Sequence, residues 1–254
     1  MRAAVAIDGP AGAGKSTVGR ALARRLGWLY VDTGAMYRAA TLKALRMGAE
    51  FADAAALAKI AADARIEFVD EPAPGDESPV RVLLDGEDVT EAIRRPELTR
   101  HVKHVASCAA ARREMVRRQR ELAESRPVVM EGRDIGTVVL PDAVAKFYLD
   151  ASLEERARRR AIDIERQGGG PADLATVMRE LELRDRSDRE RDAGPLARAE
   201  DAEVVDTTGM TVAEVVEALE SRTRSRLAAA ARSARAGDGA SDVDHGVRGT
   251  AVRP

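Results

Sequence analysis

A glycine-rich turn near the start of the chain has the residue types that a phosphate-binding loop needs. Residues 5–17 read V-A-I-D-G-P-A-G-A-G-K-S-T, an apolar run followed by glycines, a lysine and two hydroxyl residues. Gly9, Gly12 and Gly14 tolerate the positive φ angles that let successive backbone N–H groups point at one anion. Residues 9–16 match the Walker A pattern without a mismatch, and they lie between an apolar run and a helical pattern, as that motif requires. This context disfavours the alternative, a glycine-rich turn that binds nothing.

The chemistry expected of this loop is binding of ATP together with Mg²⁺. Lys15 is a mobile charge that can bridge the β- and γ-phosphates, and the hydroxyl oxygen of Ser16 can bind Mg²⁺. The helix that follows directs the positive end of its dipole at the same phosphates. The loop residues expected to bind ATP are Gly9, Pro10, Ala11, Gly12, Ala13, Gly14, Lys15, Ser16 and Thr17.

Arginines at strand ends are the candidates for a second substrate site opposite the loop. Bidentate guanidinium groups suit a site that holds the negative charges of two nucleotides, and ligands of an open α/β sheet bind at the carboxyl ends of its strands. Arg38 lies one turn into the helix predicted after the second strand, with Tyr37 beside it. Arg133 directly follows the strand predicted over residues 128–130. A solvated helix face is the alternative for Arg38, whereas a functional role is favoured for Arg133 because it lies in a loop.

The third candidate is the charged segment 184–191, which reads R-D-R-S-D-R-E-R. Arg184, Asp188 and Arg191 stand at i, i+4 and i+7 of a predicted helix, so one face presents a cation, an anion and a cation. In an arginine-rich protein, this spacing alone favours an ion-paired, solvent-exposed face. A role in the acceptor site therefore needs support from outside the spacing.

The scaffold expected to position these residues alternates strands and helices. Continuous apolar runs, typical of buried parallel strands, predict strands over residues 3–7, 29–31, 128–130, 144–149 and 203–205. Helical periodicity predicts helices that begin after the loop and end at Gly27, and over residues 35–47, 54–64, 109–124, 153–166, 172–191 and 211–227. In the helix over residues 172–191, we expect Leu174, Val177, Leu181 and Leu183 to face inward.

A β-rich insert is predicted to interrupt this alternation over residues 66–99. Residues 66–69 and 80–84 read as strands, and Asp85 and Gly86 offer a hairpin turn. Near the other end of the chain, the composition changes to Ala, Ser, Arg, Gly and Asp without apolar periodicity. The predicted organisation is a core over residues 1–65 and 100–229, an insert over residues 66–99 and a disordered tail over residues 230–254.

Composition narrows the class of protein. The 41 basic and 43 acidic residues nearly cancel, which argues against a charge-driven binder of nucleic acid or membrane. The single cysteine, Cys108, excludes an intramolecular disulfide and fits a reducing compartment. The sequence lacks asparagine and therefore the N-K-x-D motif that reads guanine, which argues against a GTPase switch. With neither a membrane-spanning run nor a signal peptide visible, we expect a cytoplasmic protein.

The motifs taken together resemble bacterial cytidylate kinases. The segments 8–17, 32–38, 84–89, 131–139 and 184–191 occur in the order and spacing of that family, and the resemblance extends from residue 3 to about residue 227. It implies a P-loop nucleoside monophosphate kinase with about five parallel strands flanked by helices, an NMP-binding insert and a short helical lid over about residues 156–171. The implied reaction, part of pyrimidine nucleotide metabolism, transfers a phosphoryl group from ATP–Mg²⁺ to CMP or dCMP.

The resemblance also implies roles for individual residues. Catalysis would rest on Lys15 and Arg133, which hold the transferred group. The residues implied around CMP are Thr33, Tyr37, Arg38 and Arg133 at the phosphate, Arg184, Asp188 and Arg191 at the ribose, phosphate and base, and Arg112 and Asp134 at the cytosine. The lid residues implied to close over ATP are Arg156, Arg159 and Arg160. Lys103 and Ser187 depart from the family pattern, in which serine and arginine are common at these positions.

Two other interpretations stay open on the sequence. The first is a kinase of the same class with another acceptor, such as AMP, UMP or shikimate. The second is an ATP-driven regulatory or structural P-loop protein, which would hydrolyse ATP slowly and without stimulation by a monophosphate. For the kinase, the expected partners are ATP, CMP and dCMP, with no nucleic acid and no membrane, and the expected state is a monomer.

Overall fold

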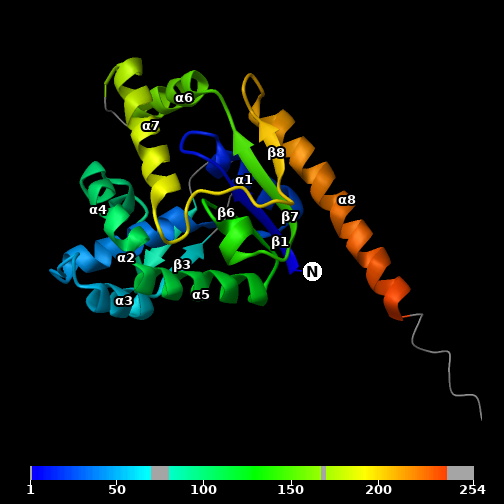
Figure 1. The fold of residues 1–254 in the computed structure, drawn as a ribbon, viewed down its shortest axis with the longest axis horizontal. Coiled ribbons are helices and arrows are strands. Elements are labelled where there is room, and N and C mark those ends of the chain that lie inside the picture. The colour runs from blue at the N-terminus through cyan, green and yellow to red at the C-terminus, as the bar shows by residue number, and fades with distance from the viewer. Residues whose placement is uncertain (1, 70–79, 167–169, 239–254) are drawn as a thin grey trace, which may run out of the picture.

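A five-stranded parallel sheet forms the centre of the molecule (Figure 1), as predicted. The computed structural model describes residues 2–69, 80–166 and 170–238. The strand order is β2–β6–β1–β7–β8, and the carboxyl ends of the strands point towards α6 and α7. The strands are β1 (Arg2–Asp8), β2 (Leu29–Asp32), β6 (Val128–Gly132), β7 (Ala143–Asp150) and β8 (Glu203–Asp206).

Helices cover both faces of the sheet because β1, its central strand, is apolar on both sides. Ala4 and Ala6 pack into one core cluster, to which α2 (Thr33–Arg46) and α5 (Ala109–Ser125) contribute. Val5 and Ile7 pack into the other, with α1 (Lys15–Leu26) and α8 (Val212–Asp238). All four side chains are fully buried. The alternation of faces along one strand thus builds a three-layer α/β core.

The region predicted as a β-rich insert contains an antiparallel three-stranded sheet, with strands at both predicted positions. Its strands are β3 (Ile66–Val69), β4 (Arg81–Leu84) and β5 (Glu87–Asp88). The hairpin turn uses Asp85 and Gly86, whose φ angles of 53° and 88° fit a tight turn. A 3₁₀ turn (Ala92–Arg94) leads into α4 (Pro96–Ser107), which packs on α2, while α3 (Ala54–Asp63) packs on α5. The predicted domain boundary at residues 99–100 therefore falls inside a helix.

Helices α6 (Leu153–Arg166) and α7 (Leu174–Glu190) pack together beyond the carboxyl ends of the strands (Figure 1). The prediction that Leu174 and Leu183 face inward is wrong, because they are 43% and 64% exposed. The buried positions of α7 are Val177, Leu181 and Asp185, a single stripe at i, i+4 and i+8. Two helices that pack mainly on each other bury only such a narrow stripe. Residues 167–169 of the predicted lid lie outside the described residues.

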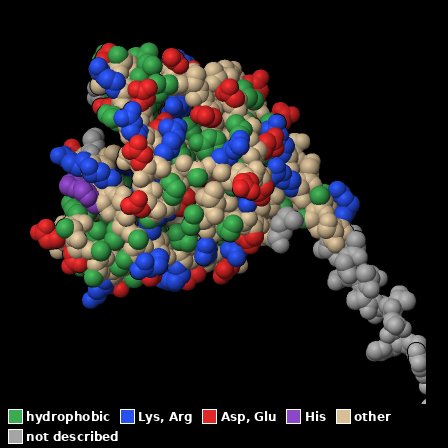
Figure 2. All heavy atoms as spheres, in the orientation of Figure 1, with side chains coloured by type: hydrophobic (Ala, Val, Ile, Leu, Met, Phe, Trp, Pro, Cys, Tyr) green, Lys and Arg blue, Asp and Glu red, His purple; other side chains and the backbone are tan. Residues whose placement is uncertain are grey.

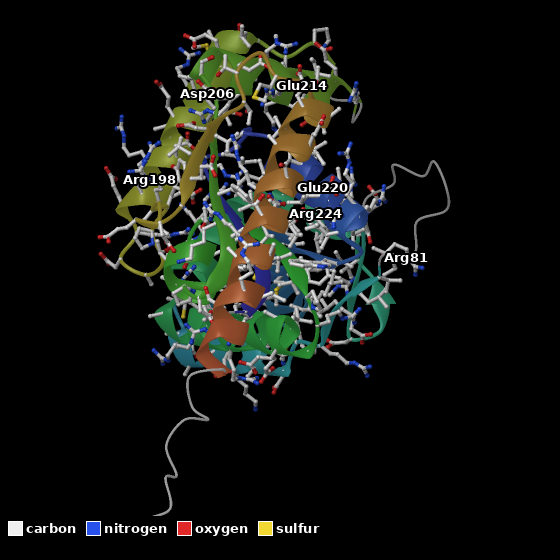
Figure 3. The ribbon with its side chains drawn as sticks, turned by 90° about the vertical axis from the view of Figure 1, so that its right-hand side faces the viewer. Arg81, Arg198, Asp206, Glu214, Glu220 and Arg224 are labelled. Carbon is white, nitrogen blue, oxygen red and sulfur yellow. The ribbon has the colours of Figure 1, made fainter. Side chains whose placement is uncertain are left out.

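Helix α8 continues through part of the segment predicted to be a disordered tail. It ends at Asp238, so residues 230–238 of the predicted tail are helical, and the rest of that tail, residues 239–254, lies outside the described residues. The alanines and arginines of this segment favour a helix even without apolar periodicity, and Leu227 and Ala230 pack against the core. Figure 3 shows Glu220 and Arg224 side by side on α8, where they form an ion pair of 2.8 Å.

Candidate functional site

The glycine-rich loop connects β1 to α1 at the carboxyl edge of the sheet, as predicted. Gly9, Gly12 and Gly14 have φ angles of 146°, 80° and 83°, which confirms the positive φ expected of each. A Cβ atom on Gly9 would collide with the carbonyl oxygen of Leu149. Glycine is therefore required at position 9 by both conformation and space.

The side chain of Lys15 reaches across the inside of this loop. Its side chain is 6% exposed, and its ammonium donates a hydrogen bond of 2.6 Å to the carbonyl oxygen of Pro10. Burial, followed by the charge of Arg133, lowers the pKa of Lys15 to about 7, although Glu131 acts in the opposite direction. The lysine is thus a desolvated cation, and a phosphate chain in the loop would strengthen its charge.

Two side chains with oxygen atoms, those of Ser16 and Glu131, lie near the lysine. Ser16 lies in the exposed first turn of α1, and Glu131 is buried at the end of β6, where it accepts a hydrogen bond of 2.5 Å from the hydroxyl of Tyr30. Burial, followed by the charge of Asp32, raises the pKa of Glu131, while Lys15 and hydrogen bonds from Ser16 and Tyr30 lower it in part. The described residues contain no group of three or more His, Cys, Asp or Glu side chains that could hold a metal. This small donor set fits Mg²⁺, which binds proteins through one or two side chains and completes its coordination with phosphates and water.

Arg133 and the charged face of α7 meet across the cleft. The guanidinium of Arg133 donates a hydrogen bond of 2.7 Å to Asp188, which also lies 3.7 Å from Arg191. Burial opposes the charge of Arg133, but the charge and hydrogen bond of Asp188 raise its pKa overall. Arg184 reaches solvent, yet the surrounding walls of the cleft and the charge of Arg133 lower its pKa to about 10. Three cations therefore lie around one shared carboxylate.

Arg112 and Asp134 form a buried ion pair at one end of this cluster. The guanidinium of Arg112 also lies over the ring of Tyr37, 5.5 Å from its centre. Burial raises the pKa of Asp134, while Arg112 and Arg191 lower it in part. The backbone of Gly194 closes over the pair, because a Cβ atom at that position would collide with both side chains. The pair is thus held from two sides.

Arg38 and Thr33 line the same cleft from α2. The guanidinium of Arg38 donates to the hydroxyl of Thr99 at 3.0 Å, which links the core to the insert. Burial lowers the pKa of Arg38; Asp32 opposes this shift, whereas Arg160, Arg94 and Arg133 add to it. The hydroxyl of Thr33 donates to the backbone carbonyl of Glu131 at 2.7 Å. The charges of nearby arginines therefore lower the pKa of Arg38.

The three arginines predicted for the lid differ in their surroundings. Arg159 donates to the carbonyl and hydroxyl oxygens of Thr207 at 2.8 and 3.0 Å, beside the glycine-rich loop. Arg160 is exposed. Arg156 is buried, and its guanidinium is hydrogen-bonded to Ala11, Ala151 and Asp185. The guanidinium of Arg156 is therefore held by the backbone of the loop and by Asp185 on α7.

The space-filling view shows the molecule hollowed between α7 and α4, with Lys and Arg side chains at the rim (Figure 2). Helices α7 and α4 thus border a hollow whose rim carries basic side chains. Sequence reasoning missed Asp8, Glu131 and Asp185 as parts of this region. The signal was present only in part: each is an acidic residue within a motif segment, but its partner lies far away in the sequence.

Comparison with known proteins found relatives that match most of the chain. The sequence profile of the family described as cytidylate kinase matches residues 5–225. A cytidylate kinase from Desulforamulus reducens is 52% identical over 215 residues, which cover 85% of this chain and 94% of that protein. A cytidylate kinase from Pelotomaculum thermopropionicum is 50% identical over 218 residues, or 86% and 94% of the two chains. An uncharacterised protein from Eubacterium ventriosum has a similar structure, with a TM-score of 0.50 and 12% identity over 89% of this chain and 99% of that one.

Proposed function

The chain belongs to the cytidylate kinase family, and we propose how the residues of its cleft carry out phosphoryl transfer from ATP to CMP or dCMP. Members of this family are nucleoside monophosphate kinases. The observation that carries the proposal is the closeness of Lys15 in the donor loop to Arg133 in the arginine cluster, which is near enough to lower the pKa of the lysine. A transferable phosphoryl group would lie between these two cations.

The donor end is the loop over residues 9–17. Its backbone N–H groups and the start of α1 would hold the phosphates of ATP, and Lys15 would exchange the Pro10 carbonyl for phosphate oxygens. Arg159 and Arg160 would approach ATP from α6, because Arg159 lies beside Gly14 and Arg160 is exposed on the same helix. When Mg²⁺ is bound with ATP, it neutralises phosphate charge, and Ser16 and Glu131 are the side chains that would hold it.

The acceptor phosphate would lie among Thr33, Tyr37, Arg38, Arg133 and the face of α7. Arg133 and Arg191 share Asp188, so the carboxylate keeps these cations in place until the phosphate arrives. Arg184 is exposed on the same face of α7, where it would reach the phosphate or ribose of the acceptor. Cations in this arrangement suit the bidentate recognition of phosphate oxygens.

Cytosine recognition would fall to Arg112 and Asp134. The exocyclic amine of cytosine is a hydrogen-bond donor, so it needs an acceptor such as the Asp134 carboxylate. The ion pair with Arg112 orients that carboxylate, and the contact of Arg112 with Tyr37 fixes the guanidinium. The side chains then present an acceptor to the amine and a donor to the ring carbonyl of the same base.

The transfer requires positioning and charge neutralisation more than proton transfer. The oxygen of the acceptor phosphate is already ionised at neutral pH, so no strong general base is needed. Lys15 and Arg133 would stabilise the charge that spreads over the oxygens of the transferred group. Movement of α6 and α7 would exclude water and so prevent hydrolysis of ATP.

A coupled assay of ADP release across CMP, dCMP, UMP and AMP tests this proposal. We expect turnover with CMP and dCMP, and a loss of orders of magnitude in Lys15→Ala with the fold retained by circular dichroism. Near-normal turnover of that variant would contradict the assignment of the donor loop. Slow ATP hydrolysis that no monophosphate stimulates would instead indicate a regulatory P-loop protein.

The proposal also includes a monomeric enzyme in the cytoplasm. Within the described ranges, no helix has both the length and the apolar character needed to cross a membrane. Sedimentation of the purified protein, alone and with its nucleotides, tests the monomer.

A further inference from the structure

The peptide groups around Ala11, in the middle of the glycine-rich loop, are held by two charged side chains from the lid helices. The backbone N–H of Ala11 donates to Oδ1 of Asp185 on α7 at 3.0 Å. Its carbonyl oxygen accepts from Nη1 of Arg156 on α6 at 3.0 Å. The same Nη1 lies 2.6 Å from Oδ2 of Asp185, which closes a ring of three hydrogen bonds.

This arrangement is buried and fully paired. Asp185 is 2% exposed and Arg156 7% exposed, and Nε of Arg156 donates to the carbonyl of Ala151 at 3.1 Å. A buried ion pair contributes little net stability on average, since desolvation offsets the attraction between the charges. Its geometry is nevertheless specific, because each charge depends on the other and on one backbone position.

The side chain of Ala11 joins the same region from another direction. It packs in a small cluster with Ala157 on α6 and with Val177 and Leu181 on α7, separate from the two clusters of the main core. A Cβ atom on the neighbouring Gly12 would lie 3.1 Å from the Cβ and the backbone oxygen of Arg156. The loop and the two lid helices are therefore in direct contact along both residues.

We propose that Arg156 and Asp185 are positioning residues that set the orientation of the Ala11 peptide groups and thereby shape the loop for ATP. With its N–H turned towards Asp185, Ala11 does not donate into the loop, and the N–H groups that follow are left to face the phosphates. The pair also links the loop to α6 and α7, so the position of the lid is transmitted to the donor site. The inference rests on the proposed function of the loop as the ATP site.

Asp185→Asn separates positioning from direct binding of ATP by Arg156. The asparagine keeps the size of the side chain but leaves Arg156 without its counter-ion. If Arg156 binds phosphate directly, release of its guanidinium leaves ATP affinity unchanged or increased. If the pair positions Ala11, the Kd for ATP measured by calorimetry rises about tenfold, as expected for the loss of one charged hydrogen bond, and the KM for CMP changes little.

The double variant Arg156→Met/Asp185→Leu separates positioning from stability. Apolar replacement of a buried ion pair is often neutral for stability, so we expect thermal unfolding near that of the wild type together with weakened ATP binding. A double variant that folds and binds ATP like the wild type overturns the proposal. If it does not fold, Arg156→Lys serves instead, because lysine keeps the charge but cannot bridge Ala11 and Asp185 with a forked group; wild-type affinity for ATP in this variant also overturns the proposal.

Matched controls come from the exposed faces of the same helices. Arg158→Met on α6 and Glu182→Gln on α7 remove equal charges from exposed positions, and both are expected to bind ATP as the wild type does. If the loop is not the ATP site, the wild-type protein itself would not bind ATP there, and this result differs from a failure of the positioning proposal. Loss of ATP binding in the pair variants alone, with CMP affinity kept, supports the positioning role.

Discussion

Oδ1 of Asp8 accepts a hydrogen bond of 2.8 Å from the backbone N–H of Ile135. The second carboxylate oxygen of Asp8 accepts from the N–H of Gly136, also at 2.8 Å. Asp8 is the last residue of β1, directly before the donor loop, while Ile135 and Gly136 belong to the turn that carries Arg133 and Asp134. One carboxylate therefore fixes the two halves of the proposed site relative to each other.

Substitution of this carboxylate tests that relationship. In Asp8→Asn, the amide oxygen can accept from only one side, and its NH₂ group then faces the other N–H donor. The cost of an unpaired buried donor, about 1–3 kcal/mol, would fall on the acceptor turn, so we expect a rise in the KM for CMP that exceeds the rise in the KM for ATP. Steady-state kinetics with each substrate varied in turn measures both, and equal effects on the two would argue against the role.

The same contact predicts a loss of activity in mild acid. Burial, opposed by the backbone hydrogen bonds of Gly136 and Ile135, raises the pKa of Asp8 to about 6. Below that pH the carboxyl gains a proton and loses an acceptor oxygen, so we expect the KM for CMP to rise as pH falls through about 6. The phosphate of CMP also takes up a proton near pH 6, so both proteins share that change. Asp8→Asn cannot titrate, and its KM for CMP should therefore rise less steeply than that of the wild type as pH falls.

Gly194 offers a test of the Arg112–Asp134 pair that leaves both charged residues in place. In Gly194→Ala, the new methyl group would collide with both side chains and displace them. Gly48→Ala is a matched control, because Gly48 has a φ of 63° against 61° for Gly194, yet its Cβ would meet no atom within 4 Å. We expect the KM for CMP to rise about tenfold in Gly194→Ala only. Similar kinetics for the two variants would mean that backbone strain, and not the ion pair, sets CMP affinity.

Features encoded by neighbouring residues were predictable from the sequence. The strands of the sheet are apolar runs, and the donor loop carries its own glycine pattern. Each of these depends on residues only a few positions apart. Local propensity therefore determines them before any tertiary contact forms.

Features that depend on distant partners were not predictable. Arg156 has the sequence context of a lid cation, but its partners Asp185 and Ala11 lie 29 and 145 residues away and draw it beneath the loop. The predicted orientation of Leu183 was wrong for a related reason, since helical periodicity does not reveal how wide a face the neighbouring helix covers. Pairing across such distances is decided by the folded chain as a whole.

Asp134→Asn tests recognition of the base. The asparagine can donate as well as accept, so it should tolerate the ring carbonyl that UMP presents where CMP has an amine. We expect the ratio of kcat/KM for CMP to that for UMP to fall by about tenfold or more, as for other losses of a buried polar contact. Asp142→Asn removes an equal charge from an exposed residue and should leave the ratio unchanged. Asp134→Ala should weaken discrimination among CMP, UMP and AMP, and unchanged preference in either Asp134 variant would contradict the assignment.

The lowered pKa of Lys15 predicts that the protein takes up a proton when it binds ATP. Burial lowers its pKa to about 7 in the ligand-free protein, so most molecules have a neutral lysine at pH 8, whereas the phosphates of ATP favour the charged form. Binding at pH 8 should therefore consume close to one proton per ATP, and affinity should fall as pH rises above about 7. Calorimetry in two buffers with different ionisation enthalpies measures the uptake. In Lys15→Arg the side chain stays charged at this pH, so ATP binding should not be accompanied by proton uptake at position 15, whatever the affinity of the variant. Equal proton uptake by the two proteins would mean that another group titrates.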